Sequence, residues 1–137
     1  MTPSAFQNGE PILNGDLIPV ERDVQHLKAL YDGEISYWDE YLGKMLAFLQ
    51  ENQLMENTLL VITSDHGEQF GEHGKWVHAN SLYEEVLRVP LYMRYDGIIP
   101  AGIVLDNPVQ NFDLMPTILE WAGIGSSQNL DAVGLQS

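Results

Sequence analysis

The spacing of apolar residues predicts one long amphipathic helix, over residues 21–52. Gly33 and Gly43 lie inside it, and each weakens the helix by about 1 kcal/mol relative to alanine. Packing of its apolar stripe can offset this cost, and one of the two glycines is a candidate bend. The stripe recurs at steps of three and four residues, which places it on one helical face: Leu27, Tyr31, Ile35, Trp38, Leu42, Met45, Leu46 and Leu49.

The apolar run TLLVITS, residues 58–64, predicts a strand. Its threonines and branched aliphatic residues run without polar alternation, which is typical of a strand covered on both faces. The stretch LYMRY, residues 91–95, predicts a second strand. A long amphipathic helix that leads into a buried strand indicates an α/β fold class.

Shorter elements are expected around these two strands. Residues 81–90 have a helical or turn character that a proline ends, and residues 96–109 predict a turn-rich loop with one short strand. A short helix is predicted with Asp113 as its N-cap, Pro116 in its first turn and Gly123 at its end.

The two ends of the chain lack periodicity. The first 19 residues carry three prolines, two glycines and two asparagines, which predicts a loop or an extended arm. We therefore expect an N-terminal arm or linker over residues 1–20, a domain over residues 21–125 and a polar tail over residues 126–137.

Composition limits the partners of this chain. With 137 residues and 45% hydrophobic content, the chain is the size of one domain. Six Lys and Arg against 20 Asp and Glu give a net charge of −14, which argues against nucleic acid or an anionic membrane surface as a partner. No apolar run approaches the ~20 residues of a membrane helix. An anionic substrate would therefore need a local cation, such as a bound metal.

The segment SDHGEQFGEHGKWVH, residues 64–78, holds three of the four histidines. Asp65 and His66 follow the predicted strand at its carboxyl end, where α/β sheets bind ligands, and Gly67 permits a tight turn. A carboxylate and an imidazole can coordinate one divalent cation: zinc, manganese or, with more oxygen ligands, calcium. Two ligands do not complete such a site, and there is no cysteine to add another.

The same residues, taken singly, also fit simpler roles. Asp-His-Gly at a strand end fits an ordinary turn, in which Asp65 accepts backbone N–H bonds. The histidine spacings match no local zinc-protease pattern such as H-E-x-x-H. The other ionisable residues individually fit solvated charges or hydrogen-bonded histidines: Glu68, Glu72, His73, Lys75 and His78.

Four motifs, taken together and in order, favour a functional site over these simpler roles. SDHGEQFGEHG, then SLYEEVLRVPLYMR, then NFDLMPTILEWAGI together resemble the C-terminal part of the sulfatase catalytic domain, and the helix and strand before them resemble the same family's approach to its site. The resemblance covers about residues 24–135. It implies part of an alkaline-phosphatase-like α/β/α sandwich with a metal at the strand ends.

The resemblance also implies roles for individual residues. It assigns metal binding to Asp65 and His66, with calcium as the expected ion. Many sulfatases have a lysine a few residues further on that touches the sulfate and the leaving-group oxygen. His78 corresponds to it here, and Lys75 is close enough to compete. A protonated His78 could neutralise a sulfate ester or donate a proton to its leaving group, so we expect it to be catalytic and substrate-binding.

The family's nucleophile has no counterpart in this sequence. The resemblance implies attack on sulfur by a hydrated formylglycine, made from Cys or Ser in C/S-x-P-x-R, and that motif does not occur here. The family's paired N-terminal metal-binding aspartates are also without a match. We therefore expect a fragment of a metal-dependent sulfatase that is inactive alone, with the formylglycine in the missing part.

Two alternatives stay open from the sequence. One is a phosphonate or phosphate ester hydrolase of the same superfamily, which shares Asp-His-Gly. The other is a non-catalytic domain that binds a metal or a partner chain, in which an exposed sheet edge and helix face would favour self-association.

Overall fold

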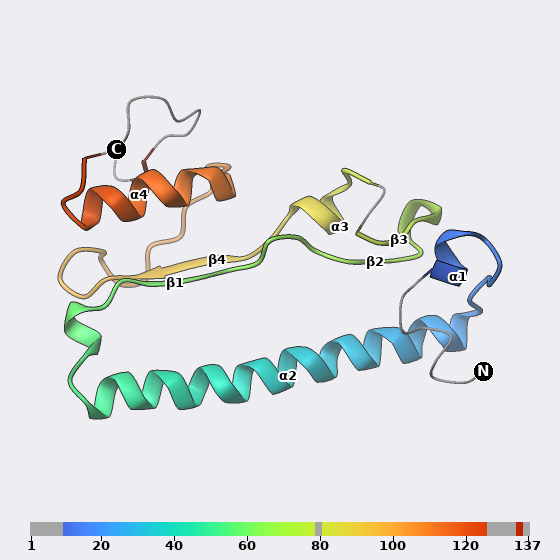
Figure 1. Ribbon diagram of the computed structural model, residues 1–137, viewed down its shortest axis with the longest axis horizontal. Helices are drawn as coiled ribbons and strands as arrows, with labels where there is room; N and C mark the ends of the chain where they lie inside the picture. The colour runs from blue at the N-terminus through green and yellow to red at the C-terminus, as the bar shows by residue number, and fades with distance from the viewer. Residues whose placement is uncertain (1–9, 79–80, 126–133, 136–137) are drawn as a thin grey trace. The chain divides into compact units, whose positions relative to one another are not determined.

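The computed structural model describes residues 10–78, 81–125 and 134–135. The chain divides into two compact units, Met1–Ala101 and Gly102–Ser137. The first unit contains the helices α1 (Glu10–Leu13), α2 (Glu21–Glu51) and α3 (Glu84–Leu87), the 3₁₀ turns η2 (Met55–Asn57) and η3 (Glu72–Gly74), and the strands β1 (Leu60–Thr63), β2 (Gln69–Phe70), β3 (Trp76–Val77) and β4 (Leu91–Arg94) (Figure 1). The second unit contains η4 (Asn111–Asp113) and α4 (Leu114–Trp121).

The long helix predicted over residues 21–52 is confirmed as α2, which spans 31 residues. At its start, the backbone N–H of Val20 donates to the carboxylate of Asp23 at 3.0 Å. At its end, the side-chain amide of Asn52 donates to the carbonyl oxygen of Phe48 at 2.8 Å. Both glycines lie inside the helix and neither interrupts it.

The apolar stripe of α2 packs only in part. Tyr31 meets the edge of the Phe70 ring in β2, with 5.4 Å between ring centroids. Lys28 pairs with Glu72 at 3.3 Å, so the N-terminal half of α2 is held to the segment around β2. Further along, Trp38 remains 51% exposed, and no residue of α2 is fully buried. Much of this helix is therefore uncovered in the described chain.

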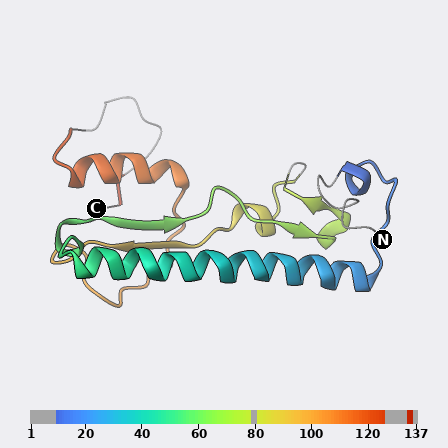
Figure 2. The ribbon, with the colours of Figure 1, turned by 60° about the horizontal axis from the view of Figure 1, so that its bottom comes forward.

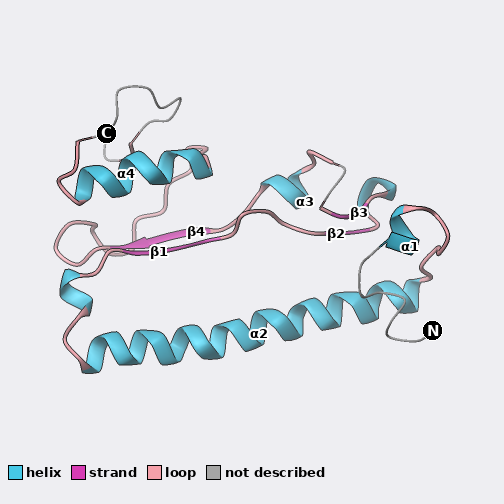
Figure 3. Cartoon of the chain, viewed as in Figure 1, coloured by secondary structure: helices cyan, strands magenta, loops and turns pink. Residues whose placement is uncertain are grey.

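The predicted strand after α2 is confirmed as β1, and the second predicted strand as β4. The two pair antiparallel, with Leu60 opposite Arg94 and Thr63 opposite Leu91 (Figure 3). The first three residues of β1 are half-buried and Thr63 is exposed, so the expectation of a strand covered on both faces is only partly met. Pairing with β4 covers an edge of β1, whereas burial of its two faces requires packed layers, which the described residues supply only in part.

The short helix predicted near the C-terminus is confirmed as α4, with Asp113 at its N-cap. The Asp113 carboxylate accepts the backbone N–H of Gln110 at 2.9 Å and so closes η4. Inside α4, Thr117 is fully buried, and its hydroxyl donates to the Asp113 carbonyl oxygen at 2.5 Å. Gly123 follows the helix with a φ of 71°, the left-handed conformation that commonly ends helices.

Two expectations about the connections differ from the structure. A helical turn, α1, occupies residues 10–13, where a loop was expected. No strand forms over residues 96–109, where Val104 is 85% exposed and lacks a neighbouring strand to pair with. Residues 1–9 and most of the predicted tail lie outside the described residues. No helix in the described chain has the length and apolar character needed to cross a membrane.

A small hairpin follows β1 that the sequence pattern did not predict. Strands β2 and β3 pair antiparallel, with Gln69 opposite Val77 and Phe70 opposite Trp76 (Figure 2). Gly71 begins the turn with a φ of 104° and lies against the Trp76 ring, where an added Cβ would come within 3.1 Å. The positive φ therefore favours glycine there, and a Cβ would require the Trp76 ring to shift by a few tenths of an ångström.

Gly67 docks the turn after β1 onto α3. Its N–H donates to the carbonyl oxygen of Val86 at 2.8 Å. A Cβ at this position would lie 2.0 Å from the carbonyl oxygen of Glu85, a backbone atom that cannot rotate away. Only glycine permits this approach.

We therefore predict that Gly67→Ala destabilises the fold by about 2 to 3 kcal/mol, because the clash forces the turn away from α3. Unfolding in urea, followed by circular dichroism, measures this change. Gly33→Ala is the matched control, since nothing lies within 4 Å of its added Cβ and alanine favours the helix. Equal urea midpoints for Gly67→Ala and the unchanged chain would contradict this assignment.

Candidate functional site

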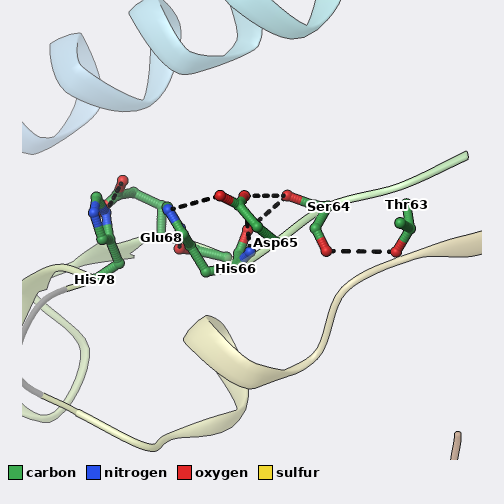
Figure 4. A network of polar contacts seen from close by, with 7 residues as sticks. Thr63, Ser64, Asp65, His66, Glu68 and His78 are labelled. Atoms are coloured by element: carbon green, nitrogen blue, oxygen red, sulfur yellow. Dashed lines mark hydrogen bonds and ion pairs between the residues drawn. The ribbon is translucent and has the colours of Figure 1, made fainter. Parts of the chain in front are cut away.

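The structure brings the two predicted metal ligands together where β1 ends (Figure 4). The Asp65 side chain is 87% exposed, and its Oδ2 lies 3.7 Å from Nε2 of His66. Its Oδ1 accepts the backbone N–H of His66 at 3.0 Å, which fixes the carboxylate beside the ring. One oxygen and one nitrogen donor thus lie close together on an open surface.

The hydrogen bond of the His66 ring shows which nitrogen is available to a ligand. Nδ1 lies 2.9 Å from the carbonyl oxygen of Gly67. Because a carbonyl oxygen can only accept, Nδ1 carries the proton and Nε2 is left with its lone pair. Histidines that bind metals typically donate their other ring N–H in this way. The nitrogen that faces Asp65 is therefore the one suited to a metal ion.

Ser64 also forms hydrogen bonds within this turn, a role that the sequence pattern did not predict. Its hydroxyl donates to the carbonyl oxygen of His66 at 2.7 Å and lies 3.5 Å from Oδ1 of Asp65. A serine directly before Asp-His-Gly is the signal that could have identified it, since serine hydroxyls commonly bond to the backbone two residues on.

The same turn keeps the Asp65 carboxyl ionised. Its pKa is lowered, first by the hydrogen bond from the backbone N–H of Asp65 and then by that from the backbone N–H of His66. Hydrogen bonds to the charged form of a carboxyl favour that form. Asp65 is therefore a carboxylate at neutral pH, the state required of a metal ligand.

His78 reaches this pair through the hairpin. Its ring is stacked on that of His66, with 3.8 Å between centroids and 22° between planes. Its Nδ1 lies 3.2 Å from Oε2 of Glu68 (Figure 4). The predicted substrate contact thus lies directly beside the predicted metal ligands.

Lys75 is placed differently. Its side chain is exposed in the turn between β2 and β3, where its carbonyl oxygen accepts the N–H of Gly71 at 2.9 Å. No hydrogen bond or ion pair of its ammonium group is found among the described residues. The structure brings His78, and not Lys75, into contact with the Asp65–His66 turn.

The other ionisable residues of the segment hold the hairpin in place. Oε2 of Glu72 accepts the N–H of Phe70 at 2.5 Å, while its other oxygen pairs with the Lys28 ammonium. His73 lies with Nε2 3.4 Å from Oε1 of Glu85 and stacks on Tyr83 at 3.9 Å. The interpretation of Glu72 as a solvated charge is therefore wrong, whereas the contacts of His73 agree with its interpretation as a histidine with partners in the fold.

Asp65 and His66 alone would not complete a metal site. Over residues 10–78, 81–125 and 134–135, no group of three or more His, Cys, Asp or Glu residues could hold a metal ion. Asp65 and His66 offer two donors, whereas catalytic zinc typically has about three protein ligands and calcium about six or more oxygens. Further ligands would have to be added to this pair.

Comparisons with known proteins show the family of this chain. The family model described as Sulfatase matches residues 2–124. Choline-sulfatase of Rhizobium meliloti (strain 1021) is 38% identical over 104 residues, which are 76% of this chain and 20% of that protein. Arylsulfatase K of Homo sapiens is 34% identical over 115 residues, which are 84% of this chain and 21% of that protein. The chain thus spans about a fifth of the length of these curated relatives.

Solved structures of related enzymes share the fold of this chain. Phosphonate monoester hydrolase SpPMH from Silicibacter pomeroyi superposes with a TM-score of 0.83 and 35% identity, over 99% of this chain and 26% of that one. A structure of BT4656 in complex with D-glucosamine-2-N,6-O-disulfate gives 0.78 and 29%, over 97% of this chain and 28% of that one. The chain belongs to the sulfatase family and forms part of its alkaline-phosphatase-like α/β fold.

Proposed function

We propose that this chain forms one wall of the active site of an enzyme that hydrolyses sulfate esters. The observation that carries the proposal is the Asp65–His66 pair, held at the end of β1 with a carboxylate and a bare Nε2 side by side. The curated relatives support the substrate class, because they include choline-sulfatase and N-acetylglucosamine-6-O-sulfatase.

The pair is proposed to bind a divalent cation. The sulfatase family generally uses such a metal together with a formylglycine. The ion we propose is calcium, for which Asp65 would provide hard oxygen donors and His66 a nitrogen donor. A bound metal ion would supply positive charge to stabilise oxyanion charge. Such a charge is needed locally, because the chain as a whole carries −14.

His78 is proposed to contact the sulfate group and to give a proton to the leaving-group oxygen. Its contact with His66 supports this, because the ring lies beside the metal ligands. With Nδ1 bonded to Glu68, Nε2 is the nitrogen left for a substrate. Lys75, from the same hairpin, is proposed as a second and more distant cation for the substrate anion.

The nucleophile is proposed to lie outside this sequence, in which C/S-x-P-x-R does not occur. Within the sequence, we propose residues 21–125 as part of the catalytic domain, residues 1–20 as an arm and residues 126–137 as a tail. The isolated chain is proposed to self-associate through α2, where Tyr37 is 61% exposed and Phe48 58% exposed.

A second candidate is hydrolysis of phosphonate monoesters. The structural match to a phosphonate monoester hydrolase, with a TM-score of 0.83, favours it specifically. A tetrahedral phosphonate monoester anion presents the same need for a metal ion and a cationic donor. The nucleophile of the completed enzyme would distinguish the two activities.

The role of His78 predicts the binding of an aryl sulfate. In the presence of calcium chloride, His78→Ala should weaken binding of 4-nitrophenyl sulfate about tenfold, because it removes one charge-assisted hydrogen bond. Isothermal titration calorimetry measures the affinity, and Lys44→Ala on α2 is the control for loss of a positive charge. If Lys75→Ala weakens binding while His78→Ala does not, the sulfate contact is Lys75 and this assignment is wrong.

The absence of the nucleophile motif predicts that the purified chain does not hydrolyse an aryl sulfate. Release of 4-nitrophenol in the presence of calcium should equal that of the buffer alone. Metal-dependent turnover that Asp65→Ala abolishes would contradict the proposal that the nucleophile lies elsewhere.

A further inference from the structure

We infer that Glu68 is a positioning residue, which fixes the His78 ring so that Nε2 is presented to the substrate. The inference rests on the proposed function for the role of His78 alone. The orientation of the ring follows from contacts within this chain.

The contact between Glu68 and His78 specifies one tautomer of the ring. Oε2 of Glu68 lies 3.2 Å from Nδ1 of His78. An ionised carboxylate can only accept a hydrogen bond, so one proton lies on Nδ1. Nε2 then holds the lone pair of the neutral ring or, in the protonated ring, the proton that would be given to the substrate. This is the pattern by which a carboxylate orients a functional histidine elsewhere.

Glu68 is not an ordinary surface acid. Its side chain is only 22% exposed. Its second oxygen, Oε1, is buried and has no hydrogen-bond partner among the described residues. A partly buried carboxylate is costly unless it is paired, and the pairing found here is with His78. The interpretation of Glu68 as a solvated charge is therefore wrong.

The hairpin brings the two residues together. Gln69 pairs with Val77 across β2 and β3, so Glu68 and His78 are the next opposed positions, at the open end of the hairpin. Val77 has a φ of 57°, an unusual value for a β-branched residue that costs about 1 to 3 kcal/mol.

His66 holds the other side of the ring. The two imidazoles are stacked at 3.8 Å, and His66 is itself fixed by its bond to the Gly67 carbonyl oxygen. A lysine would bring a charge whose three donors rotate freely, whereas an imidazole acts only through the nitrogen that is turned to the substrate. Glu68 supplies the orientation that a histidine needs in this position.

The same segment contains a histidine that meets a carboxylate through its other ring nitrogen. His73 meets Oε1 of Glu85 through Nε2, at 3.4 Å, so its proton is expected on Nε2. His66 carries its proton on Nδ1 because of the Gly67 carbonyl oxygen. These two rings serve as internal references for His78 in one sample.

The tautomers can be read directly by long-range ¹H–¹⁵N correlation spectra of the ¹⁵N-labelled full chain, at a pH at which the imidazoles are neutral. We expect His78 and His66 to show a protonated Nδ1 and a bare Nε2, and His73 to show the reverse. In Glu68→Met, the His78 pattern should change to a protonated Nε2, while His66 and His73 keep theirs. Glu68→Gln, whose amide oxygen can still accept, should retain the His78 pattern in part.

Two results would overturn the inference: a protonated Nε2 on His78 in the unchanged chain, or a His78 tautomer that is the same in Glu68→Met. The measurement needs neither metal nor substrate, so its outcome is separate from that of the proposed function. If the tautomer depends on Glu68 but His78→Ala binds an aryl sulfate normally, the orienting contact stands and the sulfate contact fails.

Discussion

The hydrogen bond between Nδ1 of His66 and the carbonyl oxygen of Gly67 is the contact on which the site depends. It decides which nitrogen of the ring is bare, and the bare nitrogen is the one beside the Asp65 carboxylate. The Gly67 carbonyl is held in turn, because the N–H of Gly67 donates to the carbonyl oxygen of Val86. The two backbones lie so close there that position 67 has no room for a side chain. A backbone contact between the turn and α3 thus determines the chemistry offered at the end of β1.

Around this contact, the hairpin adds a second histidine to the first. His66 and His78 are stacked, and each is bonded through Nδ1, one to a carbonyl oxygen and the other to a carboxylate. Both rings therefore keep Nε2 for an external partner. In a chain of net charge −14, a metal ion on one ring and a cationic donor on the other would create the local positive charge that an ester of sulfate requires.

The large elements could be predicted from the sequence because they repeat a pattern. The stripe of α2 follows the helical period over 31 residues, and α4 is bounded by a capping aspartate and a glycine. The positions of Asp65 and His66 could be predicted as well, because they directly follow β1. The full burial expected for β1 is not reached, because the faces of the strand are only partly covered among the described residues.

The contacts inside the site could not be predicted in this way. Strands of two residues have no measurable period, and the turn between β2 and β3 has left-handed backbone at Gly71, His73 and Gly74. The two glycines suggest such a turn, whereas His73 does not. The pairing of Glu68 with His78 joins residues ten positions apart, and it appears only when the register of the hairpin is known.

The most direct test of the site is paramagnetic broadening by Mn²⁺ in ¹H–¹⁵N spectra of the labelled chain, with the ion added below one equivalent. Binding by Asp65 and His66 predicts that the backbone signals of residues 64–67 and 78 broaden first, and that His66→Ala removes this preference. Broadening that spreads evenly over the acidic residues of α2, or that is unchanged in His66→Ala, would show non-specific attraction to a negative chain and would contradict the proposed metal site.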